Sequence, residues 1–203
     1  HQSLIILLFI ASLGLGLRML VSPFDRLVCF VAGFISALSI WVSVESILFP
    51  MVILAGLGIY WLLGEKGISR KLVHYSVSLF VLLIVFRVIE HGWSRLLEPA
   101  FDQISIAYIA LFGLIAAFWA IAHRMETQSA GTGSMAGRLG IAVIGMLVTA
   151  MLMYRFYPGF YSGPMGNVDE LFRRVHLVKI KELQPVLSPA SLMSDDWLQS
   201  ITR

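Results

Sequence analysis

Six apolar stretches follow one another along the chain, with short polar gaps between them. A hydrocarbon core about 30 Å thick requires roughly 20 apolar residues per helix. The stretches are continuously apolar and lack the two-residue alternation of a membrane β-strand, so the backbone must satisfy its polar groups within helices. We therefore predict an all-α, polytopic membrane helical bundle of about six transmembrane helices. The expected spans lie near Leu4–Val21, Leu27–Ser43, Ser46–Leu63, Leu72–Ile89, Ile104–Ala122 and Leu139–Phe156.

Composition supports this class and excludes an ordinary water-soluble domain. Hydrophobic residues make up 58% of the 203 residues, charged residues only 13%, and the mean hydropathy is +0.85. The one cysteine, Cys29, excludes a disulfide framework within the chain. His1 leads almost directly into the first apolar stretch without an initiator Met, so we expect the chain to be part of a longer polypeptide.

Lysine and arginine residues near the span ends fall mainly in alternate gaps. Cytoplasmic loops of membrane proteins are enriched in these residues. The basic gaps follow the first, third and fifth spans and contain Arg18, Arg26, Lys66, Arg70, Lys71, Arg124 and Arg138. We expect these gaps in the cytoplasm, and His1, Glu45, residues 87–103 and everything after Phe156 outside. The net charge of +3 reflects this bias and does not indicate a nucleic-acid partner.

The residues after the last span differ from the rest of the chain. A turn-rich passage from Tyr157 to Gly166 precedes Asn167, a residue suited to cap a helix. Apolar residues at helical spacing follow: Val168, Leu171, Phe172 and Val175. We therefore expect two regions: a transmembrane helical region over residues 1–156, and an extracytoplasmic loop with an amphipathic-helix tail over residues 157–203.

Candidate chemistry lies on the expected outer face. The sequence contains no CxxC pair, no GxxxxGK phosphate loop and no Ser/His/Asp order of a hydrolase. Glu45 lies at the turn between two spans with no basic residue nearby in sequence; such an acid is either functional or solvated at the interface, and both interpretations stay open. Arg87, His91 and Arg155 fall on the same face, and arginine is well suited to bind phosphate.

Several segments carry a family resemblance. They are Trp41-Val42-Ser43-Val44-Glu45, the span that ends at Arg87, Phe101-Asp102-Gln103-Ile104-Ser105, the passage from Tyr157 to Pro164, and Lys179-Ile180-Lys181-Glu182-Leu183-Gln184-Pro185. Together they resemble the central part of a GT-C membrane glycosyltransferase, and most closely bacterial relatives of the oligosaccharyltransferase catalytic subunit.

Two motifs of that family have counterparts here. An external loop of the family carries a hydrophobic-x-Glu motif, often followed by x-Gln-Pro, whose acid helps to bind the divalent metal or the acceptor. Glu182 occupies the matching position, although Ile180 and Lys181 replace the small or hydroxylated residues usual before it. A second motif, of the Asp-x-Asp/Glu or Asp-His-His type, precedes a span, and His1 and Gln2 resemble its second and third positions.

The resemblance implies an inverting glycosyltransferase that transfers a sugar or oligosaccharide from a polyprenyl-phosphate-linked donor on the non-cytoplasmic membrane face. It implies a multi-pass protein of the bacterial inner membrane with its active site on the periplasmic face, and a glycan, lipid or protein acceptor. A divalent cation, Mg²⁺ or Mn²⁺, would stabilise the departing phosphate and would be held by His1, Gln2 and Glu182. Glu182 is then the expected catalytic residue, and the expected substrate-binding residues are Glu45, Arg87, His91 and Arg155.

Two other function classes stay open. A transporter or flippase of lipid-linked intermediates would place ionisable groups and broken helices near the bilayer midplane. A non-catalytic membrane subunit would only pack against a separate enzyme.

The expected orientation is testable by labelling. A cysteine introduced as Ser162→Cys should react with a membrane-impermeant thiol reagent added outside intact cells, whereas Ser129→Cys should react only after the membrane is permeabilised. The reverse pattern would overturn the orientation drawn from the basic gaps.

Overall fold

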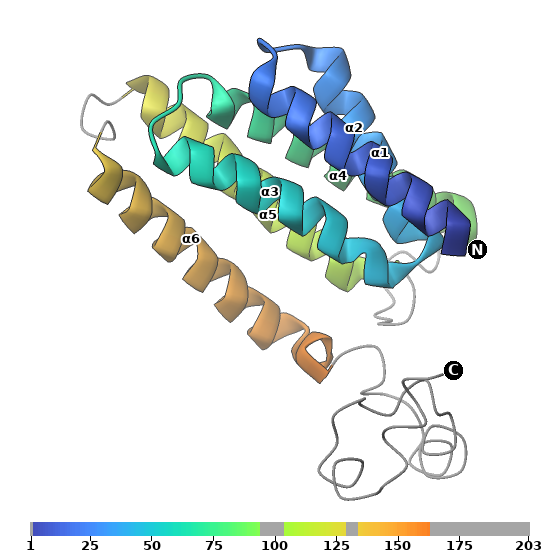
Figure 1. Cartoon of the computed structure of the whole chain (residues 1–203). Coiled ribbons are helices and arrows are strands. Elements are labelled where there is room, and N and C mark those ends of the chain that lie inside the picture. The colour runs from blue at the N-terminus through green and yellow to red at the C-terminus, as the bar shows by residue number, and fades with distance from the viewer. Residues whose placement is uncertain (1, 94–103, 129–133, 163–203) are drawn as a thin grey trace, which may run out of the picture. The chain divides into compact units, whose positions relative to one another are not determined.

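The computed structural model describes residues 2–93, 104–128 and 134–162, and these residues form helices and no strand (Figure 1). The α-helices are α1 (Gln2–Val21), α2 (Arg26–Val42), α3 (Leu48–Leu62), α4 (Ile68–His91), α5 (Ile106–Gln128) and α6 (Met135–Phe156). Two 3₁₀ helices, η1 (Val44–Ile47) and η4 (Pro158–Ser162), follow α2 and α6. The described part of the chain contains five helical stretches long and apolar enough to cross a membrane, and α2 is a shorter apolar helix of 17 residues. The prediction of an all-α, multi-pass membrane helical bundle is confirmed.

Helix ends differ from the expected spans where polar side chains find partners inside the bundle. The apolar run predicts a helix from Leu72, but α4 begins a turn earlier at Ile68. The extra turn contains Ser69, whose hydroxyl lies 2.8 Å from Nδ1 of His123 on α5, and the buried Lys71. Because these polar groups are satisfied by neighbouring helices, the first turn stays helical despite its low hydropathy.

The C-terminal residues form a separate part of the chain. Contacts divide the chain into two compact units, residues 1–164 and 165–203. The second unit lies outside the described residues, as does Glu182. The expected amphipathic tail and the expected boundary after Phe156 therefore stay predictions.

Helix α4 is the centre of the bundle. It packs most extensively against α2 and α5 and also contacts α3, while α1 lies against α2 and α3. Helix α6 packs mainly against α5, with a smaller contact to α3, and is the orange helix labelled in Figure 1. Most of the apolar surface of α6 is exposed, as expected for a helix with a broad lipid-facing side.

Small residues allow α2 and α4 to approach closely. Gly33 on α2 faces Ser78 on α4, and a Cβ atom at Gly33 would lie 2.0 Å from the Ser78 hydroxyl and 3.0 Å from the backbone nitrogen of Leu79. Polar bonds cross the same interface, since the hydroxyl groups of Ser36 and Tyr75 are 2.8 Å apart. Close backbone approach and interhelical hydrogen bonds are the main sources of helix association in lipid, where the hydrophobic effect between helices is absent.

Buried basic side chains cap helix ends at one end of the bundle. We call this the basic end; it is where α1, α3 and α5 end and α2, α4 and α6 begin, and the other is the opposite end. Lys71 donates from Nζ to the carbonyl oxygens of Met19 (2.6 Å) and Ser22 (2.7 Å) after the last turn of α1. Arg138 donates from Nη1 to the Trp61 carbonyl oxygen of α3 at 2.9 Å. The accepting carbonyl groups lie at the negative end of a helix dipole, where a cation is favourable, and the Trp61 carbonyl oxygen also accepts from the Gly64 backbone nitrogen at 3.1 Å.

Gly33→Ala should destabilise the bundle, because the added methyl group cannot fit without separating α2 from α4. We expect a loss of about 1–3 kcal/mol, the usual cost of overpacking, seen as a lower unfolding temperature in detergent. The matched control is Gly14→Ala on α1, where a Cβ meets no atom within 4 Å. Equal unfolding temperatures for the two variants would contradict the close approach at Gly33.

Candidate functional site

A polar and aromatic cluster joins α2 to α4 at the opposite end. The indole nitrogen of Trp41 donates to Oε2 of Glu90 at 3.2 Å. The Trp41 ring stacks on Phe86, with ring centroids 4.8 Å apart and planes 13° from parallel. His91 Nε2 lies 3.6 Å from Oε1 of Glu90, so the Glu90 carboxylate faces both an indole and an imidazole. The cluster therefore fixes the last turn of α2 against the last turn of α4.

Arg87 and Glu45 lie at the same end but in different environments. Arg87, in the last turns of α4, is only 1% exposed. Glu45 lies in η1 and is exposed to the surroundings, while the neighbouring Ser46 is buried. At this end the structure thus presents the exposed carboxylate of Glu45, while the Arg87 guanidinium is buried within the bundle.

Arg155 is separated from this cluster. It lies in the last turn of α6, which packs on α5 and α3 rather than on α2 and α4 as its main neighbours. The side chain is exposed, and its guanidinium carbon lies 6.0 Å from the centroid of the Phe156 ring. Of the expected substrate-binding residues, the helix pair α2–α4 thus carries Arg87 and His91 with Glu45 beside it, and Arg155 lies on a different helix.

The three expected metal ligands cannot be placed as a group. His1 and Glu182 lie outside the described residues, and Gln2 is the first residue of α1 with no described side chain. Within the described ranges, no three His, Cys, Asp or Glu side chains are close enough together to hold a metal ion. The described residues therefore do not fit a metal site, and the expected site remains a prediction that depends on His1, Gln2 and Glu182.

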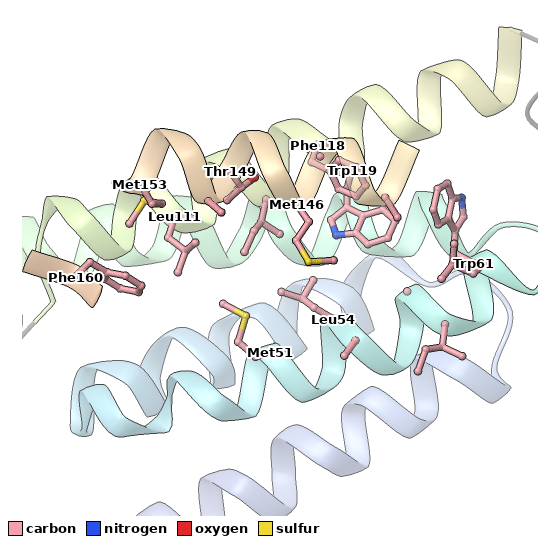
Figure 2. Close-up of a pocket in the computed structure, with 18 of the residues that line it drawn as sticks. Met51, Leu54, Trp61, Leu111, Phe118, Trp119, Met146, Thr149, Met153 and Phe160 are labelled. Atoms are coloured by element: carbon pink, nitrogen blue, oxygen red, sulfur yellow. The ribbon is translucent and has the colours of Figure 1, made fainter. Parts of the chain in front are cut away.

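A large apolar groove lies between α3, α5 and α6 (Figure 2), and we call it the α3–α6 groove. Its volume is about 650 Å³. It is lined by Met51, Leu54, Ala55, Gly58, Ile59, Trp61, Leu62, Leu111, Ile115, Phe118, Trp119, Ala142, Gly145, Met146, Thr149, Ala150, Met153, Phe160 and Tyr161. No charged residue is among them, so the groove suits an apolar ligand.

The groove follows most of α3 and the middle part of α5 and α6. On α3 its lining runs from Met51 near the opposite end to Leu62 at the basic end. A rise of 1.5 Å per residue makes this about 17 Å, and Phe160 and Tyr161 of η4 extend the lining beyond the end of α6. Figure 2 shows Phe160 at one end of the groove and Trp61 at the other, with Met146 and Thr149 of α6 facing Met51 and Leu54 of α3.

Close packing of α5 on α6 shapes one wall of the groove. A Cβ atom at Gly145 on α6 would lie 2.3 Å from two carbon atoms of the Phe118 ring on α5. The Phe118 ring in turn contacts Trp119 edge-on at 4.8 Å, and Trp119 meets Trp61 at 5.3 Å. The aromatic residues thus close the basic end of the groove, while its side between α3 and α6 lies open.

Comparison with known proteins gives no match that bears on the two ends of the bundle or on the groove. No protein-family model, no curated protein and no solved structure matches the chain.

Sequence reasoning missed the groove and two residues of the polar cluster. The groove lining is spread over three helices and η4 and consists of residues that are ordinary for any membrane span. Trp41 and Glu90 are 49 positions apart, and no periodicity links them. Gly58, Ala142 and Gly145 are small residues of the kind found at helix contacts in membranes, so by themselves they do not predict a groove.

Proposed function

We propose that the chain is part of a membrane glycosyltransferase that takes its sugar from a polyprenyl-phosphate-linked donor, with the donor's hydrocarbon chain in the α3–α6 groove. The observation that carries this proposal is the length and apolar lining of the groove. An acyl chain occupies one leaflet, half of a core about 30 Å thick. The groove runs about 17 Å along α3 alone and continues past α6. It suits a chain longer than one leaflet, and a polyisoprenoid is such a chain.

The donor's phosphate then lies at the opposite end of the bundle. Met153, which lines the groove, is two residues before Arg155, and η4 lines the groove directly after α6. The Tyr161 hydroxyl donates to the Ala150 carbonyl oxygen at 2.9 Å, which holds η4 against α6 at this point. An exposed arginine beside the mouth can pair with phosphate as a charged donor.

The α2–α4 pair contributes the second set of groups at that end. Arg87 supplies positive charge, and the Glu90 carboxylate holds Trp41 and His91 in place. We assign these residues to binding the sugar or the acceptor, since aromatic rings and carboxylates are common in polar recognition. The divalent cation expected from the family resemblance would be bound by His1, Gln2 and Glu182, and no catalytic step is assigned to the described residues through it.

The lining of the groove favours a transferase over a flippase. Moving a polar headgroup across the bilayer requires polar or ionisable groups along the route. The α3–α6 groove offers no charged residue, and Thr149 is its one aliphatic hydroxyl group. The groove can hold a hydrocarbon chain, but it offers no polar groups along which a sugar phosphate could cross the bilayer.

Filling the groove should weaken binding of a long-chain donor. In the complete protein, Ala55→Trp should raise the KM for a long polyprenyl-phosphate-linked donor about 10-fold at unchanged kcat, a change of about 1.4 kcal/mol in uniform binding. Ala55 is exposed in the groove, whereas Val52, one turn away on α3, is exposed outside it. Val52→Trp is therefore the matched control and should leave KM unchanged.

A donor with a short prenyl chain separates groove binding from other effects of the substitution. It does not fill the groove, so Ala55→Trp and Val52→Trp should have equal KM values with it. Equal KM values with the long-chain donor as well would refute the role of the groove.

Glu182→Gln tests the proposed chemistry. In the complete protein it should lower the rate of metal-dependent sugar transfer by at least about 100-fold, the scale of losing one charge-stabilising group. The amount of folded protein should not change. Unchanged activity at saturating donor would remove Glu182 from the catalytic site.

A further inference from the structure

A second groove, separate from the proposed site, lies on the outer side of α2 and α4 and reaches the basic end. Its volume is about 490 Å³, within the usual range of ligand sites. We call it the α2–α4 groove. It is lined by Arg26, Phe30, Val73, His74, Val77, Ser78, Val81 and Leu82.

Polar and apolar residues separate along this groove. Arg26 is the first residue of α2, and His74 lies two turns into α4, so both are near the basic end. Phe30 follows Arg26 by one turn, and Val77 and Val81 follow His74 toward the middle of α4. The groove thus has a cationic mouth and an apolar floor.

A further cationic group, Arg70, lies one turn before His74 near the mouth. The Arg70 guanidinium carbon lies 4.0 Å from the centroid of the Phe24 ring, and the same ring meets the His74 imidazole edge-on at 4.9 Å. In the part of the chain that the structure describes, neither Arg26 nor Arg70 forms an ion pair with an acid. The nearest acid in sequence, Asp25, accepts a hydrogen bond from the Leu27 backbone nitrogen at 2.8 Å as the cap of α2. The positive charge at the mouth is therefore available to an anion.

The apolar floor has the depth of one leaflet. From Val73 to Leu82 the rise along α4 is about 14 Å, close to half of a hydrocarbon core about 30 Å thick. Val77 and Val81 are 42% and 47% exposed, and Phe30 is 50% exposed, so the floor is open to lipid. A single acyl chain matches this depth, whereas a polyisoprenoid exceeds it.

We propose that the α2–α4 groove binds one anionic phospholipid of the leaflet at the basic end. Its phosphate lies between Arg26 and Arg70, next to His74, and one acyl chain lies along Val77 and Val81. The charge of the mouth selects an anionic over a zwitterionic headgroup, and the apolar floor excludes a peptide or a free sugar phosphate. The site is independent of the proposed transferase function, since it shares no lining residue with the α3–α6 groove.

The headgroup arm of the test uses the purified protein in detergent and native mass spectrometry with phosphatidylglycerol or phosphatidylcholine. One phosphatidylglycerol should remain bound, and more tightly than phosphatidylcholine. Arg26→Gln and Arg70→Gln should each weaken phosphatidylglycerol binding roughly 5-fold, the attraction typical of one basic residue at an anionic interface. Arg124→Gln is the matched control, an exposed arginine of the same end that lies on α5 outside the groove.

The chain arm uses two substitutions on the same exposed row of α4. Val77→Trp should fill the floor and displace the lipid, while Val85→Trp, on the same row but beyond the groove, should not. Glycerophosphate, which carries the headgroup phosphate without acyl chains, should fail to displace the lipid at millimolar concentration.

Three results would overturn the proposal. The first is equal loss of phosphatidylglycerol in Arg26→Gln and Arg124→Gln, which would indicate general surface charge. The second is equal retention in Val77→Trp and Val85→Trp, which would indicate lipid bound elsewhere. The third is displacement by glycerophosphate, which would identify the mouth as a site for free phosphate.

Discussion

The close approach of α2 to α4 at Gly33 positions most of the polar groups at both ends of these helices. Because no side chain separates the helices there, the Ser78 hydroxyl on α4 lies within 3.5 Å of the Cys29 carbonyl oxygen on α2. At the opposite end the same pair places Trp41 on Phe86 and Glu90. At the basic end it places Arg26 beside His74. A wider spacing between α2 and α4 would separate Trp41 from Phe86 and Glu90 at the opposite end and Arg26 from His74 at the basic end. The arrangement at both ends therefore depends on Gly33.

The basic residues have two physical roles that the sequence pattern does not separate. Lys71 and Arg138 are each 7% exposed and donate to carbonyl groups at the ends of α1 and α3. These bonds bring a positive charge to the negative end of each helix dipole, where a cation is favourable. Lys71 and Arg138 therefore belong to the basic residues that indicate orientation and also hold the bundle together. The exposed charges Arg18, Arg26, Lys66, Arg70 and Arg124 still give this end its positive surface.

The helical spans could be predicted because span length and apolar content are properties of each segment alone. Their ends could not, because Ser69 and Lys71 are helical only through partners on α5 and α1. Of the candidate site, the predicted span Leu72–Ile89 contains Arg87, whereas His91, expected in the external segment that follows, lies in the last turn of α4. It could not show that Arg155 lies on a helix with different main neighbours, or that Trp41 bonds Glu90, since both depend on which helices pack together. The grooves depend on the same packing, and neither has a sequence motif.

The two grooves differ in the feature that decides what each can hold. In the α3–α6 groove no charged residue interrupts the lining from Met51 to Leu62, and the nearest arginine in sequence at its mouth, Arg155, is at the opposite end. In the α2–α4 groove the charge is at the basic end and the floor stops near Leu82, in the middle of α4. A lipid lies with its phosphate at the interface and its chain toward the midplane. The position of the charged residues therefore determines from which leaflet the lipid binds, and the length of the apolar floor determines how long a chain fits. The proposed polyprenyl-linked donor, with its phosphate at the opposite end, and the proposed phospholipid, with its phosphate at the basic end, would therefore occupy different grooves, because the two grooves share no lining residue.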